Sequence, residues 1–180
     1  MKILLVAINA KYIHSNLAVY CLKSYAAKRG IQTELAEYTI NHRRDDILMD
    51  IYQRKPDVVA FSCYIWNIAY VRELLADVKK VLPDVQIWMG GPEVSYDVSK
   101  TLQENPVVDL VMKGEGEETF AQLLENCVRA GGDPKNWKEI VGLAYRSPDG
   151  TGVIETGIRP YMDMSQIPFP YECVDTKELE

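Results

Sequence analysis

Five short apolar runs alternate along the chain with longer segments in which apolar residues recur every three or four positions. The runs lie at residues 2–8, 32–39, 57–62, 85–89 and 109–112. The first and third have almost no polar interruption, which is typical of strands buried on both faces of a parallel sheet. The spaced segment that follows each run predicts a helix, so the sequence predicts five consecutive strand–helix units.

The predicted helices have recognisable beginnings and ends. Asp45 or Asp46 is expected to cap the second helix, and Pro56 to end it. One continuous helix carrying Val94, Val98 and Leu102 is expected after the fourth strand. Right-handed crossovers between the strands then give an α/β fold, a doubly wound five-stranded parallel sheet with the flavodoxin-like (Rossmann-like) order 2-1-3-4-5.

Three regions are expected along the chain. Residues 1–130 form the α/β domain. Residues 131–158 form an extension with a small C-terminal β-hairpin, because two short strand patterns flank the turn sequence at residues 147–150. Residues 159–180 contain three prolines and are predicted to be an extended linker.

Composition and charge exclude several classes of protein. The chain has 180 residues, of which 47% are hydrophobic, which fits one main globular domain. With 20 Lys and Arg against 26 Asp and Glu, and no basic stripe, we expect no contact with nucleic acid. The first apolar run is too short for a bilayer, where about 20 residues are needed, and it lacks the flanks of a signal peptide, so we expect a cytoplasmic protein without membrane contact.

The cysteines do not form a recognisable metal or disulfide pattern. They are far apart and include no C-x-x-C pair, which argues against a zinc site, an iron–sulfur cluster or a disulfide framework in this chain. Reduced, isolated thiols are expected at Cys21, Cys63, Cys127 and Cys173.

Candidate chemistry is expected in the loops that follow the strands. In an open parallel sheet, ligands bind outside the carboxyl ends of the strands, at the switch point between strands 1 and 3. The loops to consider are therefore residues 9–16, 62–67, 90–95 and 114–117. Gly90-Gly91 lets a ligand approach the backbone, although turn geometry alone also explains a glycine pair. His14 is either a metal ligand or titrating group, or a solvent-facing loop residue.

The acidic turn at residues 114–118 has a simpler explanation. Glu115, Glu117 and Glu118 are expected in the first turn of a helix, where carboxylates interact favourably with the helix dipole. No arrangement typical of nucleophilic catalysis is evident. A phosphoacceptor receiver domain has the same architecture, but it needs acids at the ends of strands 1 and 3, where this chain has Asn9 and Ser62.

Five motifs together resemble one known family, the cobalamin-binding domain at the amino terminus of B12-dependent radical S-adenosylmethionine proteins. They are Met1-Lys-Ile-Leu-Leu-Val, Lys55-Pro-Asp-Val-Val-Ala-Phe-Ser62, Trp88-Met-Gly-Gly-Pro-Glu93, Asp109-Leu-Val-Met-Lys-Gly-Glu-Gly-Glu117 and Ile167-Pro-Phe-Pro170. In the wider cobalamin-binding group the first loop carries D-x-H-x-x-G, strand 3 ends in S-x-L and strand 4 ends in G-G. The S-x-L element is similar to Ser62-Cys63-Tyr64 of this chain, and the G-G element to Gly90-Gly91. Around His14 the acid and the glycine of the first element are missing.

The resemblance implies a cofactor and a set of residues that bind it. Ser62 and Gly90-Gly91 would line the channel for the nucleotide tail of cobalamin, residues 9–16 and 64–67 would lie under or beside the corrin ring, and His14 is the candidate axial ligand of cobalt. The candidate cofactor-binding residues are Asn9, Lys11, Tyr12, His14, Ser15, Asn16, Ser62, Cys63, Tyr64, Trp66, Asn67, Gly90, Gly91, Pro92, Glu93, Gly114, Glu115 and Gly116.

The resemblance also implies a partner. A C-terminal radical S-adenosylmethionine domain of the same polypeptide would bind a [4Fe-4S] cluster and S-adenosylmethionine, neither of which this chain is expected to bind. That domain would carry out methyl transfer or radical chemistry, so the parent protein would be a methyltransferase or an Fe-S oxidoreductase. This chain alone would present the cofactor without catalysing a reaction. Two alternatives remain open: a degenerate B12-like fold that docks without cofactor, and a flavin-binding module.

Overall fold

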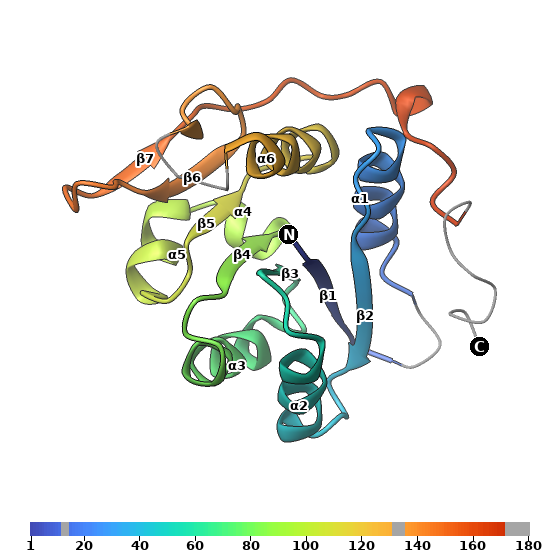
Figure 1. The fold of residues 1–180 in the computed structure, drawn as a ribbon, viewed down its shortest axis with the longest axis vertical. Helices are drawn as coiled ribbons and strands as arrows, with labels where there is room; N and C mark the ends of the chain where they lie inside the picture. The colour runs from blue at the N-terminus through green and yellow to red at the C-terminus, as the bar shows by residue number, and fades with distance from the viewer. Residues whose placement is uncertain (12–14, 131–135, 172–180) are drawn as a thin grey trace.

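The computed structural model describes residues 1–11, 15–130 and 136–171. Within these ranges seven strands form one sheet, of order β2-β1-β3-β4-β5-β6-β7 (Figure 1). The first five strands are parallel, which confirms the predicted doubly wound sheet and its order. The strands are β1 (Ile3–Asn9), β2 (Glu34–Thr39), β3 (Val58–Ser62), β4 (Gln86–Gly90), β5 (Leu110–Met112), β6 (Leu143–Arg146) and β7 (Val153–Glu155).

Helices cover both faces of the sheet. Apolar side chains of α1 and α6 pack on one face, and those of α2, α3, α4 and α5 pack on the other (Figure 1). All seven residues of β1 are buried as a result, which explains its unbroken apolar sequence. The helices are α1 (Leu17–Lys28), α2 (Arg44–Arg54), α3 (Ile68–Val81), α4 (Pro92–Ser95), α5 (Val98–Glu104) and α6 (Glu117–Ala130). Among the helices of the described residues, none is long and apolar enough to cross a membrane.

The segment after β4 differs from the single helix predicted there. It is divided into α4 and α5, with the break at Tyr96 and Asp97. The carboxylate of Asp97 accepts a hydrogen bond from the backbone N–H of Lys100 at 2.9 Å and so caps a new helix. The apolar spacing of Val94, Val98 and Leu102 was therefore correct as a buried stripe but wrong as evidence for one continuous helix.

The start of α2 also differs from the prediction. The N-cap residue is Arg43, whose side chain makes no capping hydrogen bond, and Asp45 and Asp46 lie inside the first turn. Carboxylates in a first turn are stabilised by the positive end of the helix dipole, so the two acids favour this helix start without capping it.

The predicted hairpin is present, but it is continuous with the main sheet. β6 pairs antiparallel with β5, and β7 pairs antiparallel with β6. The sheet therefore has seven strands where five were predicted. The ladder on β5 buries Leu143, Ala144 and Tyr145 completely.

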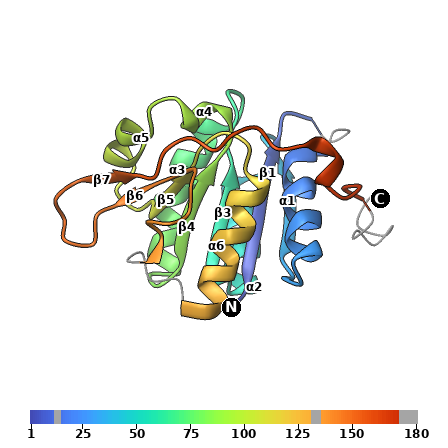
Figure 2. The ribbon, with the colours of Figure 1, turned by 90° about the horizontal axis from the view of Figure 1, so that it is seen from above.

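The segment that follows β7 crosses the molecule on the side where the parallel strands end (Figure 2). Arg159 fixes it to α6, since its guanidinium donates hydrogen bonds to Thr119 at 2.8 Å and to Gln122 at 2.8 Å. A short 3-10 helix, Met164–Gln166, comes next, and the ring of Tyr171 then packs at 5.1 Å from that of Tyr20 on α1. We call residues 157–171 the crossing segment; it packs against the domain.

Candidate cofactor site

A cavity of about 420 Å³ lies where the parallel strands end, between the sheet and helices α1 and α6. Its inner surface includes Leu5 of β1 and Ala60 of β3, which are register partners. This pair is two residues below Ser62, at the end of β3, so the cavity extends roughly 7 Å down the sheet from its edge. Ala18 and Leu22 of α1 form the opposite wall. The cavity is thus a largely apolar slot beside the switch point between β1 and β3.

The glycine pair at the end of β4 lies close to other parts of the protein, and Gly91 leaves no room for a side chain. Gly91 has φ of 109°, and a Cβ at this position would lie 2.5 Å from the carbonyl oxygen of Cys63. A Cβ at Gly90 would lie 3.3 Å from the side chain of Met112. Both glycines line the cavity. The sequence left two explanations open, approach of a ligand and turn geometry. For Gly91 the backbone conformation and the contact with Cys63 are a sufficient explanation.

A carboxylate on β2 organises the two ends of the first loop. Glu37 accepts hydrogen bonds from the side chain of Asn9 at 2.9 Å and from the backbone N–H of Asn16 at 2.8 Å. The hydroxyl of Tyr20 also donates to this carboxylate. The side-chain amide of Asn16 in turn donates to the hydroxyl of Ser62 at 3.4 Å. This network connects β2, the first loop and the edge of the cavity.

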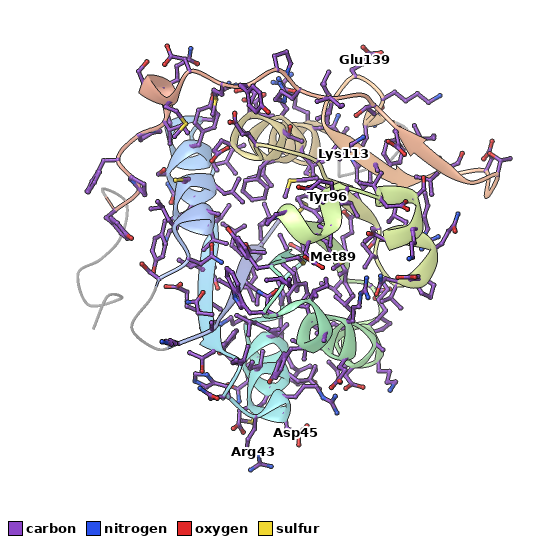
Figure 3. All side chains as sticks on the ribbon, turned by 180° about the vertical axis from the view of Figure 1, so that it is seen from behind. Arg43, Asp45, Met89, Tyr96, Lys113 and Glu139 are labelled. Carbon is purple, nitrogen blue, oxygen red and sulfur yellow. The ribbon has the colours of Figure 1, made fainter. Side chains whose placement is uncertain are left out.

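The loop after β3 presents a flat aromatic pair. The rings of Tyr64 and Trp66 are stacked, with centroids 4.4 Å apart and planes 9° from parallel. Trp66 is exposed, and its indole N–H donates to the carbonyl of Ile8. Asn67 is completely buried, and its amide donates to the carbonyls of Ile8 and Ser62, so Asn67 holds the loop in place. Tyr96 lies beyond α4 on the same side of the molecule, in the middle of the view in Figure 3.

The acidic turn before α6 forms another part of the cavity wall. The carboxylate of Glu115 accepts the backbone N–H of Met162 at 2.8 Å, which brings the crossing segment and Tyr161 to the cavity. Glu117 also lines the cavity. Burial raises the pKa of Glu117, and the nearby charge of Glu115 adds to this effect.

Contacts between α1 and α6 set the width of the slot. Glu118 accepts hydrogen bonds from the hydroxyl of Tyr25 at 2.5 Å and from Arg29 at 2.6 Å. Arg29 also pairs with Glu125 at 3.1 Å. These contacts hold the two helices together one to two turns from the cavity.

The structure brings about half of the predicted cofactor residues to the cavity. Those that line it are Ser62, Tyr64, Gly90, Gly91, Pro92, Gly114, Glu115 and Gly116. Eight others do not line it: Asn9 ends β1, Glu93 lies in α4, and the loops after β1 and β3 contain Lys11, Ser15, Asn16, Cys63, Trp66 and Asn67. Tyr12 and His14 lie outside the described residues, so the proposed role of His14 as a cobalt ligand stays a prediction.

Several lining residues were not among the candidate cofactor-binding residues, although Ser95 and Glu117 lie in the candidate loops. Most are apolar residues of the strands and of α1, which the hydrophobic pattern could identify only as core. Glu117 was predicted to be a helix-dipole carboxylate, and it does lie in the first turn of α6, but it faces the cavity as well. The lining residues outside the candidate set are Leu5, Ala18, Val19, Leu22, Ala60, Phe61, Ser95, Tyr96, Met112, Glu117 and Tyr161.

The thiols of the described cysteines are unpaired. Burial raises the pKa of Cys63 to about 12 and that of Cys127 to about 11. Within the described residues, no cluster of three or more His, Cys, Asp or Glu side chains could hold a metal ion.

Comparison with known proteins assigns the fold and the cavity to a family. The model of the B12 binding domain matches residues 3–124, which include every strand and loop that forms the cavity except the crossing segment. The chain belongs to the B12-binding domain family. This result confirms the predicted resemblance and supports cobalamin as the cofactor of the domain; the flavin-binding and cofactor-free alternatives are not favoured.

The relatives of this B12-binding domain include much longer enzymes. It is 39% identical over 92 residues to the cobalamin-dependent radical SAM methyltransferase TokK of Streptomyces tokunonensis, a match that covers 51% of this chain and 13% of that protein. It is 28% identical over 123 residues to the anaerobic magnesium-protoporphyrin IX monomethyl ester cyclase of Rubrivivax gelatinosus. That match covers 68% of this chain and 22% of that protein. The matches thus span less than a quarter of these relatives.

The same fold occurs in a solved enzyme structure. The cobalamin-dependent S-adenosylmethionine radical enzyme OxsB, with aqua-cobalamin and S-adenosylmethionine bound, aligns with a TM-score of 0.75 at 19% identity. The alignment covers 93% of this chain and 23% of that one. It thus covers a larger share of this chain than the B12-binding model does.

Proposed function

We propose that this B12-binding domain holds cobalamin with its nucleotide tail in the cavity and its corrin ring on the loops that surround the cavity mouth. The single observation that carries this proposal is the slot between β1, β3 and the helix pair α1–α6, which opens at the switch point of the sheet. Its apolar walls and small residues suit a flat heteroaromatic base on a flexible linker.

The surroundings of the cavity suit the rest of the cofactor. A corrin ring has apolar faces and a fringe of amides, so it requires flat apolar contacts with hydrogen-bonding groups around them. The stacked rings of Tyr64 and Trp66 supply such a surface. Ser15 and Lys11 are exposed near the first loop and can meet the amide fringe.

The wider function is proposed from the relatives. In the parent polypeptide a C-terminal radical SAM domain would bind a [4Fe-4S] cluster and S-adenosylmethionine and catalyse the reaction, as a radical SAM methyltransferase or an Fe-S oxidoreductase. This domain would present cobalamin to it without catalysing a reaction itself. The proposed division is residues 1–130 as the cofactor domain, 131–158 as its hairpin extension and 159–180 as the connection to the catalytic domain.

The test is a titration of the 180-residue chain with hydroxocobalamin and, separately, with FMN. Binding is followed by visible absorbance and by co-elution in gel filtration. We expect stoichiometric binding of hydroxocobalamin and none of FMN. Binding of FMN alone, or of neither compound, would overturn the proposal.

A further inference from the structure

The polar side chains that line the cavity differ in whether they already have partners. The hydroxyl of Ser62 accepts a hydrogen bond from Asn16, and that of Ser95 donates to the carbonyl of Gly91 at 2.8 Å. Glu115 accepts the N–H of Met162. The carboxyl group of Glu117 interacts with the backbone N–H groups of Gly116 and Glu117, but it has no ion pair or hydrogen bond with a side chain that the structure describes. No described side chain therefore competes with a ligand for this carboxyl group.

The surroundings of Glu117 are unusual for an acid. Its neighbours in the cavity wall include Ala18 and Leu22 of α1. Burial raises the pKa of the Cys21 thiol, also on α1, and the charge of Glu117 adds to this effect. Neighbouring Glu118 pairs with Arg29, whereas Glu117 lines the cavity together with apolar residues of α1. A carboxyl group in such a place readily shares a proton with a basic nitrogen, since its charged form is poorly solvated there.

The tail of cobalamin supplies such a nitrogen. Its dimethylbenzimidazole base is attached to ribose through one ring nitrogen, and the other carries a lone pair. If the tail lies in the cavity, this second nitrogen is not bound to cobalt, and in an apolar slot it needs a hydrogen-bond partner. We propose that Glu117 recognises the base of the nucleotide tail by sharing one proton between its carboxyl group and the free ring nitrogen.

This inference rests on the proposed function, and it adds specificity to it. Glu117 would make the domain prefer cobamides whose lower base contains a ring nitrogen over those whose lower base is a phenol. Ala18, Leu22 and Ala60 would contact any flat ring and so would not discriminate.

The experiment uses three ligands and three variants. The ligands are cobalamin, p-cresolyl cobamide, whose lower ring has no nitrogen, and cobinamide, which has no nucleotide tail. The variants are Glu117→Leu, Glu117→Gln and, as a matched control for the change of charge and size, Glu139→Leu. Glu139 is exposed and lies at the periphery of the molecule (Figure 3). Dissociation constants are measured by absorbance titration, and folding by circular dichroism.

We expect the parent chain to bind cobalamin at least about fivefold more tightly than p-cresolyl cobamide, because only cobalamin offers a partner to the carboxyl group. Glu117→Leu should weaken cobalamin binding by about tenfold and binding of the other two ligands by less than about threefold. Glu117→Gln should retain most of the affinity, since its amide N–H can donate to the ring nitrogen. Glu139→Leu should change none of the constants.

Three results would overturn the inference while leaving the proposed function intact. They are equal affinity of the parent for cobalamin and p-cresolyl cobamide, an unchanged affinity of folded Glu117→Leu for cobalamin, and an equal loss for both ligands in that variant. The comparison of cobalamin with p-cresolyl cobamide uses the unaltered chain, so it tests the inference even if Glu117→Leu does not fold. A parent chain that binds none of the ligands, or binds cobinamide as tightly as cobalamin, would overturn the proposed function and the inference with it.

Discussion

Gly91 passes so close to the backbone of Cys63 that a Cβ on Gly91 would lie 2.5 Å from the Cys63 carbonyl oxygen and 3.0 Å from its nitrogen. The N–H of Cys63 also donates to the carbonyl of Gly90 at 2.7 Å. The ends of β3 and β4 are therefore joined directly beneath the cavity. The glycine is needed because two backbones meet there.

Gly91→Ala should destabilise the domain by about 2 to 4 kcal/mol, because a positive φ and a backbone clash add together. Gly114→Ala is the matched control: Gly114 lines the same cavity with φ of 69°, and a Cβ there would meet nothing within 4 Å. Its cost should be about 1 kcal/mol, from backbone conformation alone. Urea unfolding measures the free energy of unfolding of both variants. Equal losses in the two variants would show that the contact with Cys63 does not contribute.

Ser62→Leu should weaken cobalamin binding by about tenfold or more, since filling a tight site costs on the order of 1 to 3 kcal/mol. The side chain of Ser62 faces the cavity edge, so the fold should survive. Ser62→Ala keeps the space open and should bind cobalamin within about threefold of the parent, apart from the lost contact with Asn16. Absorbance titration with circular dichroism checks both variants. A folded Ser62→Leu that binds as tightly as the parent would place the nucleotide tail elsewhere.

Glu37→Ala should loosen the start of α1. The substitution removes the acceptor for the Asn16 N–H and for the side-chain amide of Asn9, and leaving such donors unpaired costs about 1 to 3 kcal/mol. Hydrogen exchange at the Asn16 amide should accelerate accordingly. Glu34→Ala is the control on the same strand: its partners, Lys2 and Arg54, are partly exposed, so we expect a loss of less than about 1 kcal/mol. Equal effects of the two substitutions would contradict the organising role of Glu37.

Arg159→Ala should release the crossing segment without unfolding the domain. Arg159 donates three hydrogen bonds, to Thr119, Gln122 and the carbonyl of Val141. Their loss should make cleavage by chymotrypsin at Tyr161 faster, by about tenfold, while the urea midpoint of the domain changes little. Arg43→Ala removes an exposed arginine next to α2, far from this segment, and should leave the cleavage rate unchanged (Figure 3). Unchanged cleavage in Arg159→Ala would mean that the segment is held by other contacts.

The sequence predicted the sheet well because its signal is local. β1 and β3 are buried on both faces, so their apolar runs need no knowledge of the rest of the fold. The loops at the strand ends followed from topology, which placed residues such as Ser62 and Gly90 correctly. The break after α4 was missed because the apolar stripe continues across it, although Asp97 is a recognisable capping residue.

The inner wall of the cavity could not be predicted in the same way. Whether Glu117 faces solvent or a cavity depends on how closely α1 approaches α6, and that distance is set by Tyr25 and Glu118, which are 93 residues apart in the chain. The crossing segment raises a similar difficulty. Its prolines predict extended backbone, but its position depends on the pairing of Arg159 with side chains 37 and 40 residues earlier.

The raised pKa of Glu117 leads to a prediction about stability and pH. Because burial and the charge of Glu115 raise this pKa in the folded state, the folded chain holds the proton more tightly than the unfolded chain does. The stabilisation is therefore complete below the ordinary glutamate value of 4.5, and it is lost as the pH rises from there through the raised folded-state pKa.

Glu117→Gln removes this titration and keeps the shape of the side chain. Urea midpoints measured from pH 4 to pH 8 should therefore fall less steeply with pH in the variant than in the parent, and the variant should be the more stable protein at pH 8. Glu139→Gln, at an exposed site, should give a curve parallel to that of the parent. Parallel curves for the parent and Glu117→Gln would show that the carboxyl group of Glu117 is as well solvated in the folded protein as in the unfolded chain, contrary to its place in the cavity wall.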